Sequence, residues 1–240
     1  MKKLLCVFAL LAFATCIRAE IISTSESEIW VLPIVSGDIT WSSKGSQSSV
    51  YTIDDTGEDG ILNKRAKWIN TSAFSALSLT YGKASTTDNY LYGDVYARTD
   101  ATTVIFPYAT GNAFRWGYFI ANSDGYVEFS ANYQIEQQLR TEYTDELAYG
   151  FAEVMLGLYN ETASEETEDY RTLENEIYDG VFFTDSESGA LTVRLWFNAG
   201  DVGSFEACAY DEAETEMKAP EPATIALLAI GALALLRRKK

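Results

Sequence analysis

The groups that could do chemistry in this sequence are carboxylates and aromatic rings, because the 240-residue chain contains no histidine. The commonest general base and the commonest metal ligand are therefore both missing, which excludes His-containing catalytic triads and His-based zinc sites. Two carboxylates are still a sufficient set for glycoside hydrolysis. Glu128 and Glu153 fall in stretches typical of strands and could face one cleft, so a carboxylate-based glycosidase or lyase is one functional hypothesis.

The densest group of carboxylates lies in the turn DDTGEDG, where Asp54, Asp55, Glu58 and Asp59 could supply the oxygen ligands that Ca²⁺ prefers. The spacing departs from the EF-hand pattern. We therefore favour a solvated turn, predict no cofactor, and expect any bound calcium to stabilise loops only weakly.

Aromatic residues are numerous, with five tryptophans and 15 tyrosines. An exposed ring can stack on the C–H patches of a sugar, and Trp196 is the best single candidate for such a platform. Alternation along ALTVRLWFNAG puts Arg194 and Asn198 on the same outward face as Trp196. These three residues are the predicted carbohydrate-binding set, although a ring on a sheet face equally serves packing alone.

The elements that would position these side chains are marked by alternation of apolar and polar residues. Residues 125–135, GYVEFSANYQI, place every second side chain on one face, the period-2 pattern of a half-buried strand. Residues 190–200 and 202–210 show the same pattern. The expected inward residues are Val127, Phe129, Ala131, Tyr133 and Ile135, then Leu191, Val193, Leu195 and Phe197, then Phe205, Ala207 and Ala209.

About ten short strands separated by Gly, Asp and Asn turns, without a long amphipathic helix, favour an all-β antiparallel sandwich of jelly-roll type over residues 20–210. The turn NSDG predicts a hairpin between WGYFIA and residues 125–135. The acidic stretch 161–176 is predicted to be a solvated loop, and residues 211–219 an acidic spacer.

The N-terminus combines Lys2 and Lys3, an apolar run and the small residue Ala19, the layout of a secretory signal peptide over residues 1–19. The whole chain carries a net charge of -17, and 34 of its 35 acidic residues lie between the two ends. A surface this anionic repels phosphate backbones, so nucleic acid is excluded as a partner.

The C-terminus contains 14 uncharged residues, 223–236, followed by four cations. As a helix this segment would be about 21 Å long, short against a hydrocarbon core of about 30 Å. Flanking Arg and Lys side chains can compensate by reaching the headgroups, and the cations resist translocation. The pattern predicts a single transmembrane helix that holds the precursor at the inner membrane.

The last residues also resemble a known family. The tripeptide Pro220-Glu221-Pro222, the apolar segment after it and the cluster Arg237, Arg238, Lys239 and Lys240 look like the PEP-CTERM sorting signal, here over residues 220–240. The resemblance implies recognition by an exosortase, cleavage near the tripeptide, and delivery to the cell envelope or exterior of a bacterium that often makes exopolysaccharide. It says almost nothing about the exported domain.

These observations lead to one functional prediction and two alternatives. We predict a non-enzymatic, exported cell-surface or extracellular-matrix protein of structural or adhesive type. The first alternative is a carbohydrate-binding module for exopolysaccharide that uses Trp196, and the second is the carboxylate-based enzyme.

Overall fold

The computed structural model describes residues 20–31, 36–87, 89–100, 106–142 and 146–217. Within these ranges all the regular elements are strands, which confirms the all-β prediction, and no helix there could span a membrane. The predicted signal peptide and C-terminal helix lie outside the described residues. The strands are β1 Glu20–Val31, β2 Ile39–Asp54, β3 Gly57–Arg65, β4 Thr71–Ala76, β5 Thr80–Thr86, β6 Tyr90–Asp100, β7 Tyr108–Ala121, β8 Gly125–Arg140, β9 Glu146–Asn160, β10 Glu165–Tyr178, β11 Phe182–Phe197 and β12 Val202–Met217.

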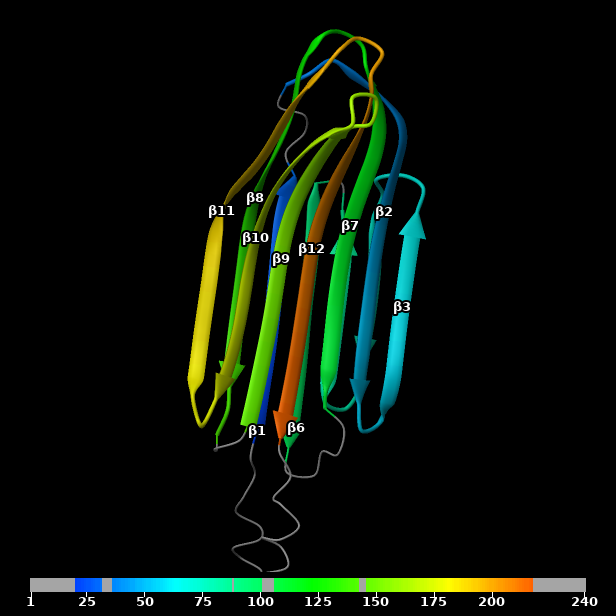
Figure 1. Cartoon of the computed structure of the whole chain (residues 1–240). Coiled ribbons are helices and arrows are strands. Elements are labelled where there is room, and N and C mark those ends of the chain that lie inside the picture. Colours follow the sequence, from blue (N-terminus) through cyan, green and yellow to red (C-terminus); the bar gives the residue numbers. More distant parts are fainter. Residues whose placement is uncertain (1–19, 32–35, 88, 101–105, 143–145, 218–240) are drawn as a thin grey trace, which may run out of the picture.

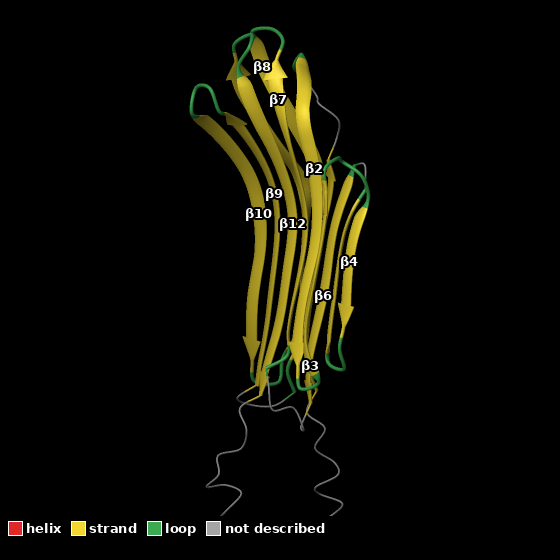
Figure 2. Ribbon diagram, turned by 90° about the vertical axis from the view of Figure 1, so that its right-hand side faces the viewer, coloured by secondary structure: helices red, strands yellow, loops and turns green. Residues whose placement is uncertain are grey.

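The strands form two six-stranded antiparallel sheets that pack face to face (Figure 1). Sheet I has the order β11-β8-β1-β6-β5-β4, and sheet II the order β10-β9-β12-β7-β2-β3. This is the predicted β-sandwich, but its strands are longer than expected: β2, β8, β11 and β12 each have 16 residues. The strands run along the long axis of an elongated body (Figure 2).

The connections between strands often cross from one sheet to the other. β9 and β10 form a hairpin in sheet II, β8 pairs with β11 in sheet I, and β7 pairs with β12 in sheet II. The predicted hairpin around NSDG is therefore wrong, because β7 and β8 lie in opposite sheets. Local turn signals predict that the chain reverses, but the neighbour of each strand is decided by contacts distant in sequence.

The two ends of the sandwich have different contents. At the tail pole, β1 begins at Glu20 and β12 ends at Met217; at the distal pole, β8 begins at Gly125 and β11 ends at Phe197 (Figure 1). A hydrogen bond of 2.7 Å between the hydroxyls of Thr99 and Thr215 ties the two sheets together near the tail pole. At about 3.3 Å per residue, β8 alone spans about 50 Å between the poles.

The apolar core lies toward the distal pole and is built from phenylalanines of both sheets. Phe129 of β8 stacks on Phe205 of β12 with ring centroids 4.3 Å apart, and Phe119 lies 5.2 Å from Phe197. All four rings are at most 1% exposed. The expected inward residues are buried as predicted, except that Leu195 is half-buried.

Two tryptophans close this core on the side of β2. Trp41 and Trp68 meet edge to face at 4.7 Å, and the Trp68 indole N–H donates to the Trp116 carbonyl at 2.6 Å. Gly117 provides the room, because a Cβ there would lie 2.4 Å from the Trp41 ring. The Lys44 ammonium sits over both rings, 4.6 Å and 4.3 Å from their centroids.

A polar layer interrupts the apolar interior toward the tail pole, where a smaller apolar cluster of Ile21, Leu139, Ala148 and Ile177 follows it. Ser25 and Ser27 of β1 point inward and contact the fully buried carboxyl of Asp211, at 3.2 Å and 2.5 Å. The predicted spacer is wrong for residues 211–217, which continue β12. Its inward residues alternate as Asp211, Ala213 and Thr215, and hydrophobicity alone does not reveal a strand whose inward residues are mostly polar.

The acidic stretch 161–176 is also not the predicted loop, because residues from Glu165 onward form β10 at an edge of sheet II. Only Leu173 and Ile177 are buried in β10, and most of its acidic side chains are exposed. Charged residues are typical of edge strands because they discourage uncontrolled pairing. At an edge strand a high charge density therefore does not indicate a loop.

Candidate functional site

The predicted carbohydrate-binding residues lie at the distal pole, on the outer face of sheet I. Trp196 of β11 pairs in register with Tyr126 of β8, and Arg194 pairs with Glu128. Trp196 is 45% exposed and Tyr126 is 47% exposed. We call Tyr126, Glu128, Arg194, Trp196 and Asn198 the distal cluster.

The two rings of the distal cluster contact each other, and a charged guanidinium packs against one of them. Tyr126 and Trp196 meet edge to face with centroids 5.1 Å apart and an interplanar angle of 85°. The Arg194 guanidinium lies 4.0 Å from the centroid of Tyr126, not over Trp196, and its Nε is 3.7 Å from Glu128 Oε2. The cluster thus offers apolar ring surface beside one cation and one anion.

Asn198 belongs to the turn that orients Trp196. The Trp196 indole N–H donates to Asn198 Oδ1 at 3.4 Å, while the Asn198 backbone N–H donates to Asp201 at 2.8 Å. The Asn198 amide and a second amide, from Asn160, hydrogen bond to the same Asp201 oxygen. The backbone hydrogen bond from Asn198, with these amides, holds the pKa of Asp201 below its usual value.

Sequence reasoning missed Tyr126 as a partner of Trp196. Both were expected to face outward, but they lie far apart in the sequence, and nothing in the sequence predicted that β8 pairs with β11. The register Trp196↔Tyr126 is what turns two exposed rings into one surface.

The four calcium candidates do not converge. Asp54 is fully buried and accepts hydrogen bonds from the Thr56 amide at 2.7 Å and the Leu79 amide at 2.6 Å. Glu58 accepts from the Tyr51 hydroxyl, and Asp59 accepts from the Ser75 hydroxyl. Asp55 is exposed at the tip of the same turn. Within the described residues, no three His, Cys, Asp or Glu side chains gather into a metal-binding group.

The two carboxylates of the enzyme hypothesis do not face one cleft. Glu128 lies on the outer face of sheet I and Glu153 on the outer face of sheet II, since both alternate with buried neighbours on strands of opposite sheets. Desolvation, together with the charge of Glu168, raises the pKa of Glu153. The expectation that this pair shares a cleft is wrong.

Both outer faces carry tyrosine hydroxyls that donate to carboxylates. On sheet I, Tyr81 donates to Asp94 at 3.0 Å, and on sheet II, Tyr149 donates to Glu174 at 3.4 Å. Desolvation and the nearby carboxylate charge raise the pKa of both phenols to about 12. These pairs give the faces a fixed pattern of rings and anions that the composition alone does not reveal.

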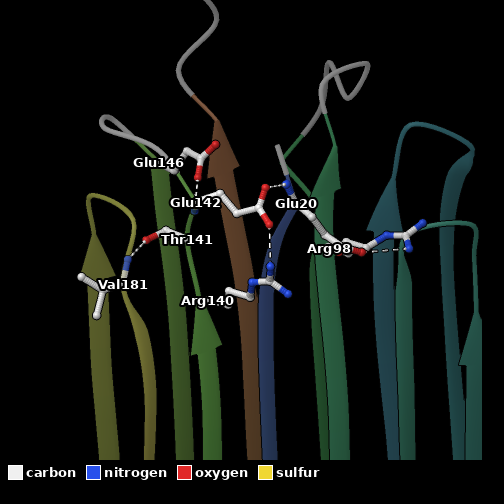
Figure 3. Close-up of polar contacts among 7 residues, drawn as sticks. All are labelled: Glu20, Arg98, Arg140, Thr141, Glu142, Glu146 and Val181. Carbon is white, nitrogen blue, oxygen red and sulfur yellow. Dashed lines mark hydrogen bonds and ion pairs between the residues drawn. The ribbon is translucent and has the colours of Figure 1, made fainter. Parts of the chain in front are cut away.

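The tail pole is closed by polar contacts between strand ends (Figure 3). The Arg140 guanidinium donates to Glu142 at 2.6 Å, and the Glu142 backbone N–H donates to Glu146 at 2.6 Å. The Arg98 guanidinium is 3.5 Å from Glu20, the first described residue. The Glu20 backbone N–H donates to Glu142 at 3.4 Å and joins the two groups, so the pole from which the C-terminal residues continue is linked across β1, β6, β8 and β9.

Comparison with known proteins identifies the C-terminal segment. The family model for the PEP-CTERM protein-sorting motif matches residues 218–240, directly after the end of β12 at Met217. The chain thus carries a PEP-CTERM sorting signal, as the resemblance suggested. The signal indicates an exported, exosortase-processed protein of the cell envelope, and the match covers none of the sandwich.

Other comparisons contribute no further argument about the sandwich. No curated protein matches the sequence. Among solved structures, vicilin from Capsicum annuum is matched at 6% identity over 82% of this chain and 72% of that chain, with a TM-score of 0.10. At that TM-score the likeness does not bear on fold or function.

Processing should depend on the tripeptide of the sorting signal. We expect replacement of Pro220, Glu221 and Pro222 by alanine to leave the precursor uncleaved and to reduce the mature form to background, because the exosortase would lose its recognition site. Immunoblots of cell fractions from the native host measure both forms. Glu216→Ala, on β12 just before the signal, is the control and should be processed normally; unchanged processing of the triple variant would contradict the prediction.

Proposed function

We propose that the exported sandwich is a structural or adhesive protein of the cell surface or extracellular matrix that displays its distal pole to the surroundings. The observation that carries this proposal is the position of the sorting signal. It follows β12 directly at the tail pole, while the distal cluster lies at the other end of an elongated body, about 50 Å away along strands of about 3.3 Å per residue. In the precursor, we propose, the segment 223–236 holds the tail pole at the inner membrane.

Surface display predicts different accessibility of the two poles in intact cells. A cysteine introduced in place of Ser123, which is exposed in the turn between β7 and β8, should react with a membrane-impermeant maleimide after export. The same reagent should label a cysteine at Asp179, in the turn between β10 and β11 near the tail pole, less well while the protein is attached. Equal labelling at both poles would contradict a display role.

The specific alternative is carbohydrate binding by the distal cluster. Its support is the exposed ring pair Trp196 and Tyr126 beside the donor Arg194, an arrangement that combines ring stacking with charged hydrogen bonding.

Trp196→Ala tests this alternative. With the full chain in detergent on a polysaccharide array, we expect binding to weaken by about tenfold or more, equivalent to about 1.4 kcal/mol. Phe182→Ala is the matched control, because Phe182 lies on the same strand at the tail pole and is 62% exposed. Absence of binding by the parent protein, or equal loss in both variants, would refute the carbohydrate-binding role and leave display standing.

We propose no catalytic role for the sandwich. The support is the separation of Glu128 and Glu153 onto opposite outer faces, which removes the carboxylate pair that suggested glycoside cleavage. Shortening of host exopolysaccharide by the purified protein would overturn this proposal.

We further infer that eight of the strands form the expected jelly roll. The support is the nested pairing of β9 with β10, β8 with β11 and β7 with β12, in alternate sheets. The central orders are β6-β1-β8-β11 and β7-β12-β9-β10. In a jelly roll whose eight strands follow chain order, the last strand lies beside the first. Here β6 is the first of the eight, and β1 takes the place of the last strand beside it. The remaining strands, β2 to β5, extend both sheets on one side.

A further inference from the structure

The two lateral edges of the sandwich carry different charges. Sheet II ends on one side in β10, whose 14 residues include six carboxylates and a single cation, Arg171. On the other side it ends in β3, which carries Glu58 and Asp59 at its start and exposed Lys64 and Arg65 at its end, followed by exposed Lys67. All four lysines of the described part of the chain lie on this side, in β2, β3, β5 or the β3–β4 segment: Lys44, Lys64, Lys67 and Lys83.

Both edges retain backbone groups able to pair. Among the described strands, β3 pairs with β2 alone and β10 with β9 alone, so one side of each strand presents N–H and C=O groups to its surroundings. On the side of β10, the edge strand of sheet I is β11. This edge is less open, because the carboxylate of Asp169 accepts the backbone N–H of Thr192 in β11 at 2.9 Å. Sheet II is therefore the sheet with two usable edges.

The directions of the edge strands also match. Sheet II has six strands and every neighbouring pair is antiparallel, so β10 and β3 run in opposite directions. A second copy placed beside the first without rotation then presents its β10 antiparallel to β3. Antiparallel strands can pair directly without a crossover connection.

We propose that copies of this chain associate edge to edge, with β3 of one copy pairing with β10 of the next. Each copy uses two different edges, so the contact is head to tail and does not close into a dimer. The product is an open-ended ribbon in which sheet II continues from copy to copy. The proposal rests on the edges of sheet II and stands whether or not the distal cluster binds polymer.

The charges select one register for this contact. In an unstaggered copy Glu58 would face Glu176, because the two residues lie in the same row across sheet II. A stagger of four residues, about 13 Å, brings Lys64 opposite Glu166 and Arg65 opposite Glu165. The same register puts Asp59 opposite Arg171, and no two like charges of the paired stretches face each other.

The same charges oppose the competing contact. Pairing of β10 with β10 of another copy would bring two strands with six carboxylates each together, and like charges directly opposite are destabilising in sheets. Acidic residues on an edge strand commonly prevent uncontrolled pairing. Here they would leave β3, with Lys64 and Arg65 at its end, as the acceptable neighbour, so a second copy of this chain is the partner that fits.

The assembly can be measured on the full chain in detergent by sedimentation velocity at low salt. We expect the average mass to rise with protein concentration beyond that of a dimer, and to return to that of the monomer at about 1 M salt, where the Debye length is about 3 Å. Lys64→Glu with Arg65→Glu should raise the concentration for half-assembly by at least about tenfold, and adding Glu165→Lys with Glu166→Lys should restore it.

The control is Arg98→Glu with Arg140→Glu, which changes the charge equally on β6 and β8, strands inside sheet I that are not edges, and should leave assembly unchanged. Circular dichroism confirms that each variant keeps its strands. The proposal is overturned if the parent chain stays monomeric at low salt, if assembly stops at a dimer, if the control loses assembly to the same extent, or if the four-residue charge exchange restores nothing. None of these outcomes touches the display role, which the labelling experiment tests separately.

Discussion

The free energy of unfolding is expected to fall as the pH rises from about 4 to about 8, and Asp211→Asn is expected to remove most of this slope. Burial raises the pKa of Asp211 from 3.8 to about 8, against the opposing effect of hydrogen bonds from Ser27 and Ser25. Below about pH 4 the carboxyl is protonated in both states. Between about pH 4 and about pH 8, the unfolded chain releases this proton while the folded chain keeps it.

The direction of the effect follows from the proton count. Between the two pKa values the unfolded state binds fewer protons than the folded state, so raising the pH favours unfolding. Each unit of pKa difference corresponds to about 1.4 kcal/mol, which makes the total effect a few kcal/mol. The nearby charges of Asp94 on β6 and Glu26 on β1 act in the same direction, because they also raise the pKa of Asp211.

The positions of the polar groups around Asp211 also accommodate the neutral form. Ser25 Oγ lies 2.8 Å from the Phe151 carbonyl and 3.2 Å from Asp211 Oδ1, and its single hydrogen can serve only one of these acceptors. A proton on Oδ1 can donate to Ser25, which then donates to Phe151. Asparagine reproduces this pattern, since its amide donates to Ser25 while its oxygen accepts from Ser27.

Urea denaturation at several pH values measures the slope. At about pH 8 the Asp211→Asn variant should be more stable than the parent by a few kcal/mol, whereas at about pH 4 the two should be similar. Glu212→Gln is the control: it changes charge equally at the next residue, whose side chain faces outward. If both variants show the same slope as the parent, Asp211 is ionised in the folded protein and its burial does not govern the pH dependence.

Phe129→Ala is expected to destabilise the sandwich by about 3–5 kcal/mol. Phe129 belongs to sheet I, and its ring contacts side chains of three strands of sheet II: Phe205 at 4.3 Å, Trp41 at 6.0 Å and Phe119 at 6.4 Å between centroids. Removing it leaves a cavity between the sheets, where rigid rings from both sides cannot collapse to fill the space.

Chemical denaturation also tests this prediction, through the midpoint and the slope of the transition. Gln134→Ala on the same strand is the control, because its side chain is exposed and its removal should cost less than about 0.5 kcal/mol. A cost for Phe129→Ala as small as that of the control would mean that the two sheets do not share one core at this point.

Much of the fold could be predicted where apolar residues alternate. The faces of residues 125–135 and 190–210 follow from period-2 patterns that depend only on neighbours along the chain. The first part of β1 and the end of β12 escaped prediction, because their inward residues include Ser23, Ser25, Ser27 and Asp211. Such side chains are stable inside only because each finds its partner on another strand, and a partner cannot be seen from the strand alone.

The candidate site shows the same division. The outward direction of Trp196 and Arg194 was predictable, but the contact of Arg194 with Tyr126 was not. The four calcium candidates were adjacent in sequence, and the structure gives three of them separate partners: Asp54 binds backbone amides, while Glu58 and Asp59 bind hydroxyls of different strands.

By itself the sequence determined the export and sorting of this protein and the β character of its exported part. Sorting is read from a contiguous segment, and alternation is a property of neighbouring residues, so neither requires knowledge of distant contacts. Only the tertiary structure decided which strands are edges, which charged residues lie on each edge, and that the sorting signal and the distal cluster occupy opposite poles. These features depend on pairing between residues far apart in the chain, for which periodicity carries no information.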